Sequence, residues 1–421
     1  MIHLTGYFLL CLLLSFATAT SAHSSTYPDN RNGVQAIKSP KNRHSSTADV
    51  TASSQQAEQR LLDIYHLIAS GYSSDAVAQA ASLAREYPNF QLAQLVYGDL
   101  LAAKIRNLHS WGDIPVEWSP KIGHTLDELR AEFHQRVLAV NDLPPPGSIP
   151  SQFLQIPLET RHAIAVDASR SRLYLFENRP EGLVLMANFY ISVGKAGIAK
   201  STQGDKRTPL GIYFITNFLD AASLKNFYGS GALPINYPNV LDLMRGKTGG
   251  GIWLHGTPPS QFSQAPQASN GCIVMANPDL TYLLQHIEVG STPVLISPQI
   301  TWVDPSETAS ESKQFDVTLQ AWHDAKESGR LDAVMSFYMS NVHGIGKSLK
   351  NWQQMLQREI SGRQGKDLAL KDVSLLHWTD SADTMVVTFV EDFSGMDVGM
   401  KKRQFWMKDG NQWKIFFETA I

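Results

Sequence analysis

The chain has 421 residues, a formal net charge of −3, and charged side chains at 18% of its positions. This length exceeds what one ordinary hydrophobic core needs, so two or three domains are expected. A net charge close to zero, without runs of like charge, argues against a general nucleic-acid-binding protein and predicts no nucleic-acid partner.

The first 22 residues have the layout of a secretory signal peptide. An apolar stretch from Tyr7 to Phe16 precedes small residues that end at Ala22. The stretch is short for a membrane span, although an uncleaved membrane anchor is the alternative interpretation. We therefore expect residues 1–22 to be a signal peptide and the protein to be exported to the periplasm or cell envelope.

A polar linker and a helical region are expected next. Residues 23–56 are rich in Ser, Thr, Asn and Gln, which predicts a disordered linker. Residues 57–145 carry apolar side chains at three- and four-residue steps, interrupted at Gly71 and Pro88, as in consecutive amphipathic helices. The region resembles one tetratricopeptide-like helix pair. A plain helical accessory region is the alternative, because solenoids need about three repeats.

Strand patterns begin after a proline-rich boundary at 144–147. Apolar runs at 163–166 and 172–176 flank a turn-like sequence and predict a hairpin, and a further β-type run covers 183–193. The sequence thus predicts a β-rich domain over residues 160–300.

The last part of the chain predicts helices followed by an antiparallel sheet. The expected helices cover 315–327, 331–338 and 349–360, and the expected strands cover 373–378, 385–390, 403–408 and 413–417. Asp409-Gly410 between the last two strands is a strong hairpin signal. Residues 312–421 should therefore form an α+β domain with a curled, cone-like sheet. The whole chain is expected to be multidomain.

Cysteine usage singles out one thiol. The chain has two cysteines, Cys11 and Cys272. If the signal peptide is removed, Cys272 has no partner in its own chain, although the compartment is oxidising. A lone thiol in such a protein is either a buried, inert side chain or a reactive group.

The neighbours of Cys272 favour the reactive alternative. His255 belongs to the apolar stretch 252–257, whose alternation places it on one face of a strand. Gly271 can adopt backbone angles closed to other residues, and such a turn can direct successive N–H groups to one point. An imidazole can take the proton of a nearby thiol, which becomes a nucleophile. The 17-residue separation of His255 from Cys272 does not by itself establish contact.

Residues from about 163 to 297 resemble the catalytic domain of the L,D-transpeptidases, the cysteine enzymes of peptidoglycan. The resemblance is carried by His255-Gly256, Ser269-Asn270-Gly271-Cys272 and the blocks at 166–167, 192–195 and 204–211, all in the family's order. One position departs from the family pattern. Asn270 stands where a second His is usual, and an Asn can form hydrogen bonds but cannot titrate.

The resemblance implies a role for each site residue. Cys272 would be the nucleophile and His255 the general base, with the Gly256 carbonyl orienting the imidazole. The backbone amides of Gly271 and Cys272 would bind the oxyanion. The implied substrate contacts are Ser269, Asn270 and Tyr237.

The implied reaction is acyl transfer from a peptidoglycan stem peptide through a thioester. An amine acceptor would give a crosslink, and water would give L,D-carboxypeptidase or endopeptidase activity. The block at 204–209, Asn236-Tyr237-Pro238 and the segment 241–251 resemble a divergent branch that includes hydrolases and enzymes that detach wall-linked lipoproteins. Asn270 and the appended C-terminal domain also favour hydrolysis. No cofactor is implied, and neither a zinc-binding motif nor a phosphate-binding glycine loop occurs.

The C-terminal domain resembles the nuclear-transport-factor-2-like (NTF2-like) domain of some cell-shape L,D-carboxypeptidases. The matching residues are 319–322, the region of Tyr338, Asn351-Trp352 and 413–415. The resemblance implies a non-catalytic module for binding or homodimerisation, because folds of this kind often carry no chemistry of their own. A different class of function, a catalytically silent wall-binding scaffold, stays open on these residues.

Overall fold

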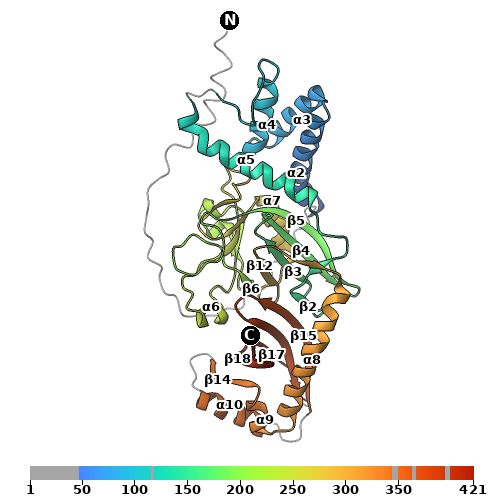
Figure 1. Ribbon diagram of the computed structural model, residues 1–421, viewed down its shortest axis with the longest axis vertical. Helices are drawn as coiled ribbons and strands as arrows, with labels where there is room; N and C mark the ends of the chain where they lie inside the picture. The colour runs from blue at the N-terminus through green and yellow to red at the C-terminus, as the bar shows by residue number, and fades with distance from the viewer. Residues whose placement is uncertain (1–46, 115–117, 344–348, 363–366, 394–398) are drawn as a thin grey trace.

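The computed structural model describes residues 47–114, 118–343, 349–362, 367–393 and 399–421. The expected signal peptide and the first part of the expected linker lie outside these residues. Within the described ranges, no helix combines the length and the apolar character needed to cross a membrane. Figure 1 shows helices at one end, a central β-rich unit, and a smaller α+β unit at the other end.

The N-terminal region consists of helices, as predicted. They are α2 (Thr47–Ala69), α3 (Ser73–Glu86), α4 (Gln91–Ala102) and α5 (Ser119–Asn141). Gly71, with a φ of +80°, makes the turn between α2 and α3. The linker was predicted to extend to Gln56, but α2 already begins at Thr47. Its start carries no strong apolar periodicity, so composition alone placed the boundary too late.

The central unit is built on a ten-stranded sheet in the order β6-β12-β3-β4-β5-β11-β9-β8-β7, with β10 beside β5. Its first strands are β3 (His162–Asp167), β4 (Arg172–Arg179), β5 (Gly182–Gly194), β6 (Gly211–Phe214), β7 (Leu219–Asp220) and β8 (Gly231–Pro234). The remaining strands are β9 (Trp253–Gly256), β10 (Gln267–Ser269), β11 (Ile273–Met275) and β12 (Pro293–Ser297). Short helices α6 (Val240–Met244) and α7 (Asn277–His286) and the 3₁₀ turns η3 (Ala221–Ser223) and η4 (Asn226–Tyr228) connect them. The predicted β3–β4 hairpin is confirmed.

The C-terminal unit has helices followed by a curled antiparallel sheet. The helices are α8 (Pro305–Glu327), α9 (Leu331–Met335) and α10 (Leu349–Ser361). The strands are β14 (Tyr338–His343), β15 (Leu368–Thr379), β16 (Asp383–Phe393), β17 (Met400–Asp409) and β18 (Gln412–Ala420). Gly410 has a φ of +60° in the expected β17–β18 turn. The helix predicted over 331–338 was too long, because Tyr338 instead begins β14 and pairs with β18.

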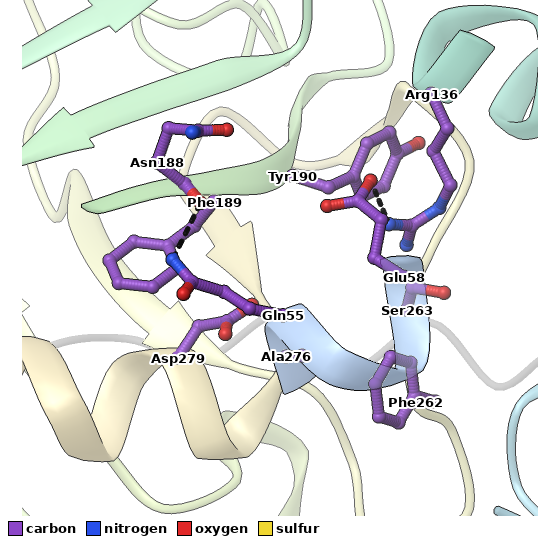
Figure 2. Close-up of a pocket in the computed structure, with 10 residues that line it drawn as sticks. All are labelled: Gln55, Glu58, Arg136, Asn188, Phe189, Tyr190, Phe262, Ser263, Ala276 and Asp279. Atoms are coloured by element: carbon purple, nitrogen blue, oxygen red, sulfur yellow. Dashed lines mark hydrogen bonds and ion pairs between the residues drawn. The ribbon is translucent and has the colours of Figure 1, made fainter. Parts of the chain in front are cut away.

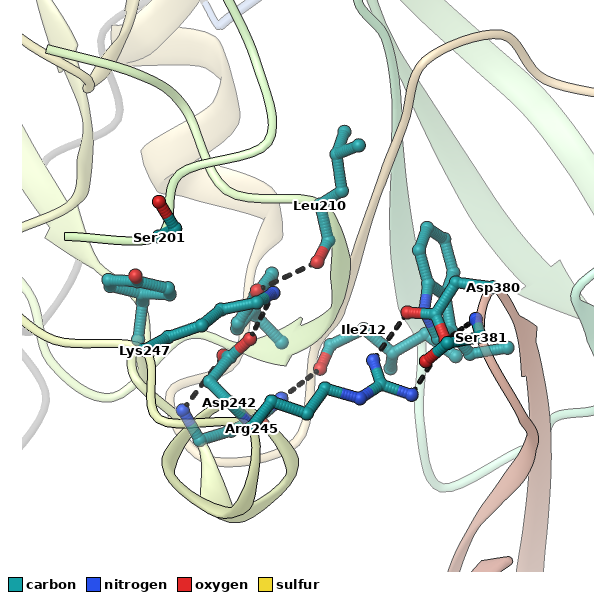
Figure 3. A network of polar contacts seen from close by, with 12 residues as sticks. Ser201, Leu210, Ile212, Asp242, Arg245, Lys247, Asp380 and Ser381 are labelled. Atoms are coloured by element: carbon teal, nitrogen blue, oxygen red, sulfur yellow. Dashed lines mark hydrogen bonds and ion pairs between the residues drawn. The ribbon is translucent and has the colours of Figure 1, made fainter. Parts of the chain in front are cut away.

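The central and C-terminal units share a hydrophobic core. Strand β2 (Phe153–Gln155), which precedes the central sheet in the chain, pairs with β15 of the C-terminal sheet. Strand β1 (Ile149–Pro150) pairs with β13 (Trp302–Val303) in the segment that joins the two units. One apolar cluster contains Phe153, Phe176 and Phe214 together with Trp378 and Phe405. The Arg245 guanidinium also forms an ion pair with Asp380 across this junction (Figure 3).

A largely buried carboxylate joins the helical region to the central sheet. Glu58 on α2 accepts hydrogen bonds from Arg136 on α5 at 2.7 Å and from both Nη atoms of Arg172 on β4 at 2.7 and 2.8 Å (Figure 2 shows Glu58 and Arg136). Burial alone would raise the pKa of Glu58. The two guanidinium groups outweigh it and lower the pKa from 4.5 to about 2. The helical region is therefore attached by specific ionic contacts and not only by apolar packing.

This attachment predicts a large stability effect at one position. Glu58→Ala leaves Arg172 buried without its carboxylate and should destabilise the protein by about 3–5 kcal/mol. Urea unfolding followed by circular dichroism measures the change. Because folding lowers the pKa of Glu58, its contribution is present above pH 4.5 and should disappear as the pH falls towards 2.

The control is Glu86→Ala. Glu86 also pairs with an arginine, Arg60, but its side chain is 53% exposed. A surface pair of this kind contributes at most about 1 kcal/mol. Equal destabilisation by the two substitutions would contradict the role assigned to Glu58.

Candidate active site

Strand β9 fixes the position and the tautomer of His255. The side chain is 1% exposed, and Nδ1 lies 2.7 Å from the Gly256 carbonyl oxygen. A carbonyl oxygen only accepts, so Nδ1 carries the proton and donates it. The Nε2 lone pair is then available as a base.

Cys272 directly precedes β11, and continued alternation from that strand would give its side chain the same face as His255. Strands β9 and β11 are parallel neighbours, with His255 opposite Val274 and Leu254 opposite Ile273. Cys272 lies two residues before Val274, and alternate side chains in a strand share a face. Its thiol is partly exposed and lies 3.5 Å from the Gly251 carbonyl oxygen.

The turn before Cys272 depends on Gly271. This residue has a φ of +121°, and a Cβ atom there would lie 2.8 Å from the Arg207 carbonyl oxygen. Its own carbonyl oxygen accepts a hydrogen bond from the Thr208 hydroxyl at 3.0 Å. Any other residue at 271 would push away the loop that carries Arg207 and Thr208.

The Ser269 side chain stabilises this turn through two hydrogen bonds. Its buried hydroxyl donates to the Cys272 carbonyl oxygen at 2.6 Å and accepts from the Gly271 N–H at 3.0 Å. An oxyanion would therefore compete with Ser269 for the Gly271 amide. This geometry favours the Cys272 amide as oxyanion donor and gives Gly271 and Ser269 structural roles in the turn.

The other two expected substrate contacts differ in accessibility. Asn270 is exposed at the tip of the turn, next to Cys272. Tyr237 is 5% exposed and packs in the central core, with its hydroxyl donating to the Thr248 carbonyl oxygen at 3.3 Å. Asn270 can reach a bound substrate. The buried Tyr237 fits a supporting position better than the substrate contact that the resemblance implied.

Lys200 is a charged neighbour of the thiol that sequence reasoning missed. It is 3% exposed, its Nζ donates to Asp205 at 2.7 Å, and it lies 5.9 Å from the centre of the Tyr237 ring. Desolvation raises the pKa of Cys272, and the positive charge of Lys200 partly opposes this shift. Asp205 falls in the 204–211 block that carried the family resemblance. Lys200 lies outside that block, so no motif marked it.

Aromatic rings cover the imidazole. The Tyr228 ring meets the His255 ring edge-on at 5.1 Å, and the Phe227 ring lies 5.7 Å away. Asn277 holds this η4 segment in place, because its Oδ1 accepts from the Ser230 N–H and its Nδ2 donates to the Thr257 carbonyl oxygen, both at 2.8 Å. Sequence reasoning missed all three, since single aromatic residues in a short 3₁₀ turn and one amide at the start of a helix carry no periodic signal.

Burial keeps both reacting groups neutral. Desolvation lowers the pKa of His255 to about 4, although its hydrogen bond to Gly256 acts in the opposite direction. Desolvation also raises the pKa of Cys272 to about 11, against the effects of the Trp253 N–H and Lys200. At neutral pH the pair is therefore a thiol beside a neutral imidazole, not a thiolate–imidazolium pair. Among the described residues, no group of three His, Cys, Asp or Glu side chains is arranged to hold a metal ion.

Comparisons with known proteins identify two domains in the chain. Residues 161–296 match the L,D-transpeptidase catalytic domain, and residues 314–419 match the Cds6 C-terminal NTF2-like domain. No curated protein matches the chain significantly. The solved structure of Bd1075 from Bdellovibrio bacteriovorus is 26% identical, with a TM-score of 0.55, over 65% of this chain and 98% of that one.

A second similar structure is that of Pgp2, a helical cell shape determining protein from Campylobacter jejuni. It is 19% identical, with a TM-score of 0.49, over 68% of this chain and 99% of that one. The matched ranges coincide with the central and C-terminal units of the fold. Residues 161–296 therefore belong to the family of L,D-transpeptidase catalytic domains, and residues 314–419 form an NTF2-like domain.

Proposed function

We propose that this protein is an exported peptidoglycan enzyme that transfers acyl groups of stem peptides through a thioester on Cys272. The proposal is supported by a partly exposed thiol directly before β11 and a base-competent imidazole on the adjacent strand β9. The membership of residues 161–296 in a catalytic-domain family supports it. For the catalytic and C-terminal units we propose the boundaries 160–300 and 312–421, and the helical region that we expected at 57–145 already begins with α2 at Thr47.

The first half-reaction forms the thioester. His255 Nε2 takes the proton of the Cys272 thiol as sulfur attacks the carbonyl carbon of the scissile peptide bond. The Cys272 N–H stabilises the oxyanion of the tetrahedral intermediate. The imidazolium then returns the proton to the leaving amine, the C–N bond breaks, and the acyl group stays on sulfur.

The second half-reaction decides between transfer and hydrolysis. His255 removes a proton from the incoming amine or water, which attacks the thioester and releases the thiol. An amine acceptor needs a shaped groove and deprotonation, whereas water needs neither to the same extent. The exposed, non-titrating Asn270 favours substantial hydrolysis beside transfer. An L,D-carboxypeptidase or endopeptidase that acts on stem peptides or wall-lipoprotein links is therefore the second candidate.

A catalytically silent scaffold is the candidate of a different class, with the C-terminal unit as a binding or homodimerising module. The environment of the thiol argues against it. A binding protein needs neither the Nδ1–H bond that prepares the His255 lone pair nor the buried Lys200 beside the nucleophile. We therefore propose that the C-terminal unit is an accessory module of a catalytically active protein.

Product analysis tests the proposed reaction. The purified protein is incubated with a disaccharide tetrapeptide, with and without an acceptor amine, and the products are identified by mass spectrometry. We expect shortened peptide in both incubations and additional dimer with the acceptor. Shortened peptide without dimer at any acceptor concentration would reject transfer and leave a hydrolase.

The nucleophile assignment predicts the outcome of one substitution. Cys272→Ala removes the acyl-enzyme route, so turnover should fall by at least about 10³-fold. Circular dichroism should be unchanged, because the partly exposed thiol contributes little packing. Turnover of the variant close to that of the wild type would rule out Cys272 as the nucleophile.

The neutral state of the pair predicts the pH dependence of alkylation. In a Cys11→Ser background, Cys272 is the only thiol. Because its pKa is raised to about 11, its reaction rate with iodoacetamide should rise about tenfold per pH unit from pH 6 to 10. The kcat/KM for peptide should fall only as the pH drops towards 4, where His255 becomes protonated. An alkylation plateau between pH 5 and 8 would instead reveal a thiolate–imidazolium pair.

A further inference from the structure

One connection in the chain joins the base to the nucleophile. It consists of residues 257–266, between β9 and β10, and we refer to it as the connecting loop. His255 lies directly before it on β9, and Ser269 and the Cys272 turn follow it. Movement of the connecting loop therefore alters the position of one reacting group relative to the other.

The middle of the connecting loop is held by the N-terminal helical region. Phe262 is 5% exposed and stacks on Phe90, with ring centres 4.4 Å apart and planes 27° apart. Its N–H donates to the Asn89 carbonyl oxygen at 2.9 Å, and the Asn89 side chain donates to the Pro259 carbonyl oxygen at 3.2 Å. Phe262 thus packs in the apolar cluster of the helices, although it belongs to the central unit by sequence.

A second contact lies one residue further along. The Ser263 hydroxyl donates to Glu132 on α5 at 2.6 Å, and Glu132 is 2% exposed and paired with Arg136. The Arg136 guanidinium lies 4.0 Å from the centre of the Tyr190 ring, whose hydroxyl donates to the Gln264 carbonyl oxygen at 2.9 Å. Figure 2 shows Arg136, Tyr190, Phe262 and Ser263 around one small cavity.

Hydrogen bonds at both ends of the connecting loop join it to the residues around His255 and Cys272. At one end, the Thr257 carbonyl oxygen is bound by Asn277, which also holds the aromatic cover of His255. At the other end, the Pro266 carbonyl oxygen accepts from Val193 N–H at 2.9 Å, and the Ser269 carbonyl oxygen accepts from Lys195 N–H at 2.8 Å. The Ser269 hydroxyl in turn fixes the backbone of Cys272.

We propose that the N-terminal helical region aligns the active site, and that Ser263 and Asn89 are positioning residues for the reaction of Cys272. The proposal rests on the proposed function. A displacement of about 1 Å between reacting groups can cost about 10²-fold in rate. Contacts that fix the connecting loop should therefore affect turnover more than they affect folding.

The test compares single substitutions, each made in the full chain that also carries Cys11→Ser. Ser263→Ala and Asn89→Ala each remove one contact between the helices and the connecting loop. Ser260→Ala is the matched control, because Ser260 lies in the same loop with an exposed side chain. Ser263→Thr keeps the hydroxyl and should restore the contact. The readouts are kcat and KM for peptide, the alkylation rate of Cys272 at pH 8, and the melting temperature.

We expect Ser263→Ala and Asn89→Ala to lower kcat about tenfold, with KM within about twofold of wild type and an altered alkylation rate. Ser260→Ala should behave as wild type, and Ser263→Thr should recover kcat. Alkylation rates of Ser263→Ala and Asn89→Ala equal to that of Ser260→Ala would overturn the proposal. So would a loss of kcat that only parallels a loss of folded protein.

The alkylation arm separates this proposal from the proposed function. If wild-type protein turns over no peptide, the proposed reaction fails. The dependence of Cys272 reactivity on Ser263 and Asn89 is still measured by alkylation in that case. An altered rate would support the alignment by the helices, and an unaltered rate would reject it.

Discussion

The parallel pairing of β9 with β11 is the constraint on which the site depends. It sets His255 opposite Val274, and continued alternation to Cys272, directly before β11, would give both side chains the same face of the sheet. Side chains alternate along a strand, so a slip of one residue in this register would turn Cys272 to the opposite face. The apolar residues on that face, among them Ile252, Leu254 and Ile273, are fully packed and fix the register.

Close backbone approach around this pair explains the glycines of the region. A side chain at Gly194 would collide with the backbone of Lys206, and one at Gly256 would collide with Asn277. These approaches hold the loop of Lys200 and the aromatic cover of His255 against the strand ends. The same crowding desolvates the site, which keeps the thiol and the imidazole neutral. The reaction that we propose therefore needs proton transfer from the thiol to the imidazole when the substrate binds.

Much of the fold could be predicted from local patterns, and the exceptions have physical reasons. The β3–β4 hairpin, the last C-terminal hairpin and the three-unit order follow from alternation and turn residues. Strand β14 could not be predicted, because a short apolar run fits a helix as well as a strand. The pairing of β2 with β15 is equally invisible, since no local signal reports a partner more than two hundred residues away.

Some residues of the candidate site could likewise be recognised in the sequence, and others could not. His255 and Cys272 could be singled out from the sequence, because a histidine at a strand end and a lone cysteine after a glycine are recognisable residue types in a motif, and their catalytic roles stay a proposal. Lys200 and Asn277 were not predicted, because their roles arise from tertiary proximity alone. The occupation of the Gly271 amide by Ser269 is likewise a property of the folded turn.

The most direct test of Cys272 as the covalent nucleophile is to detect the acyl-enzyme itself. The protein is mixed with a disaccharide tetrapeptide, quenched in acid during turnover, and its intact mass is measured. Covalent catalysis by Cys272 predicts one added acyl group on the wild-type protein and no adduct on Cys272→Ala. Hydroxylamine should release the acyl group, because it cleaves thioesters. Turnover without any adduct, or an adduct that persists in Cys272→Ala, would contradict covalent catalysis by Cys272.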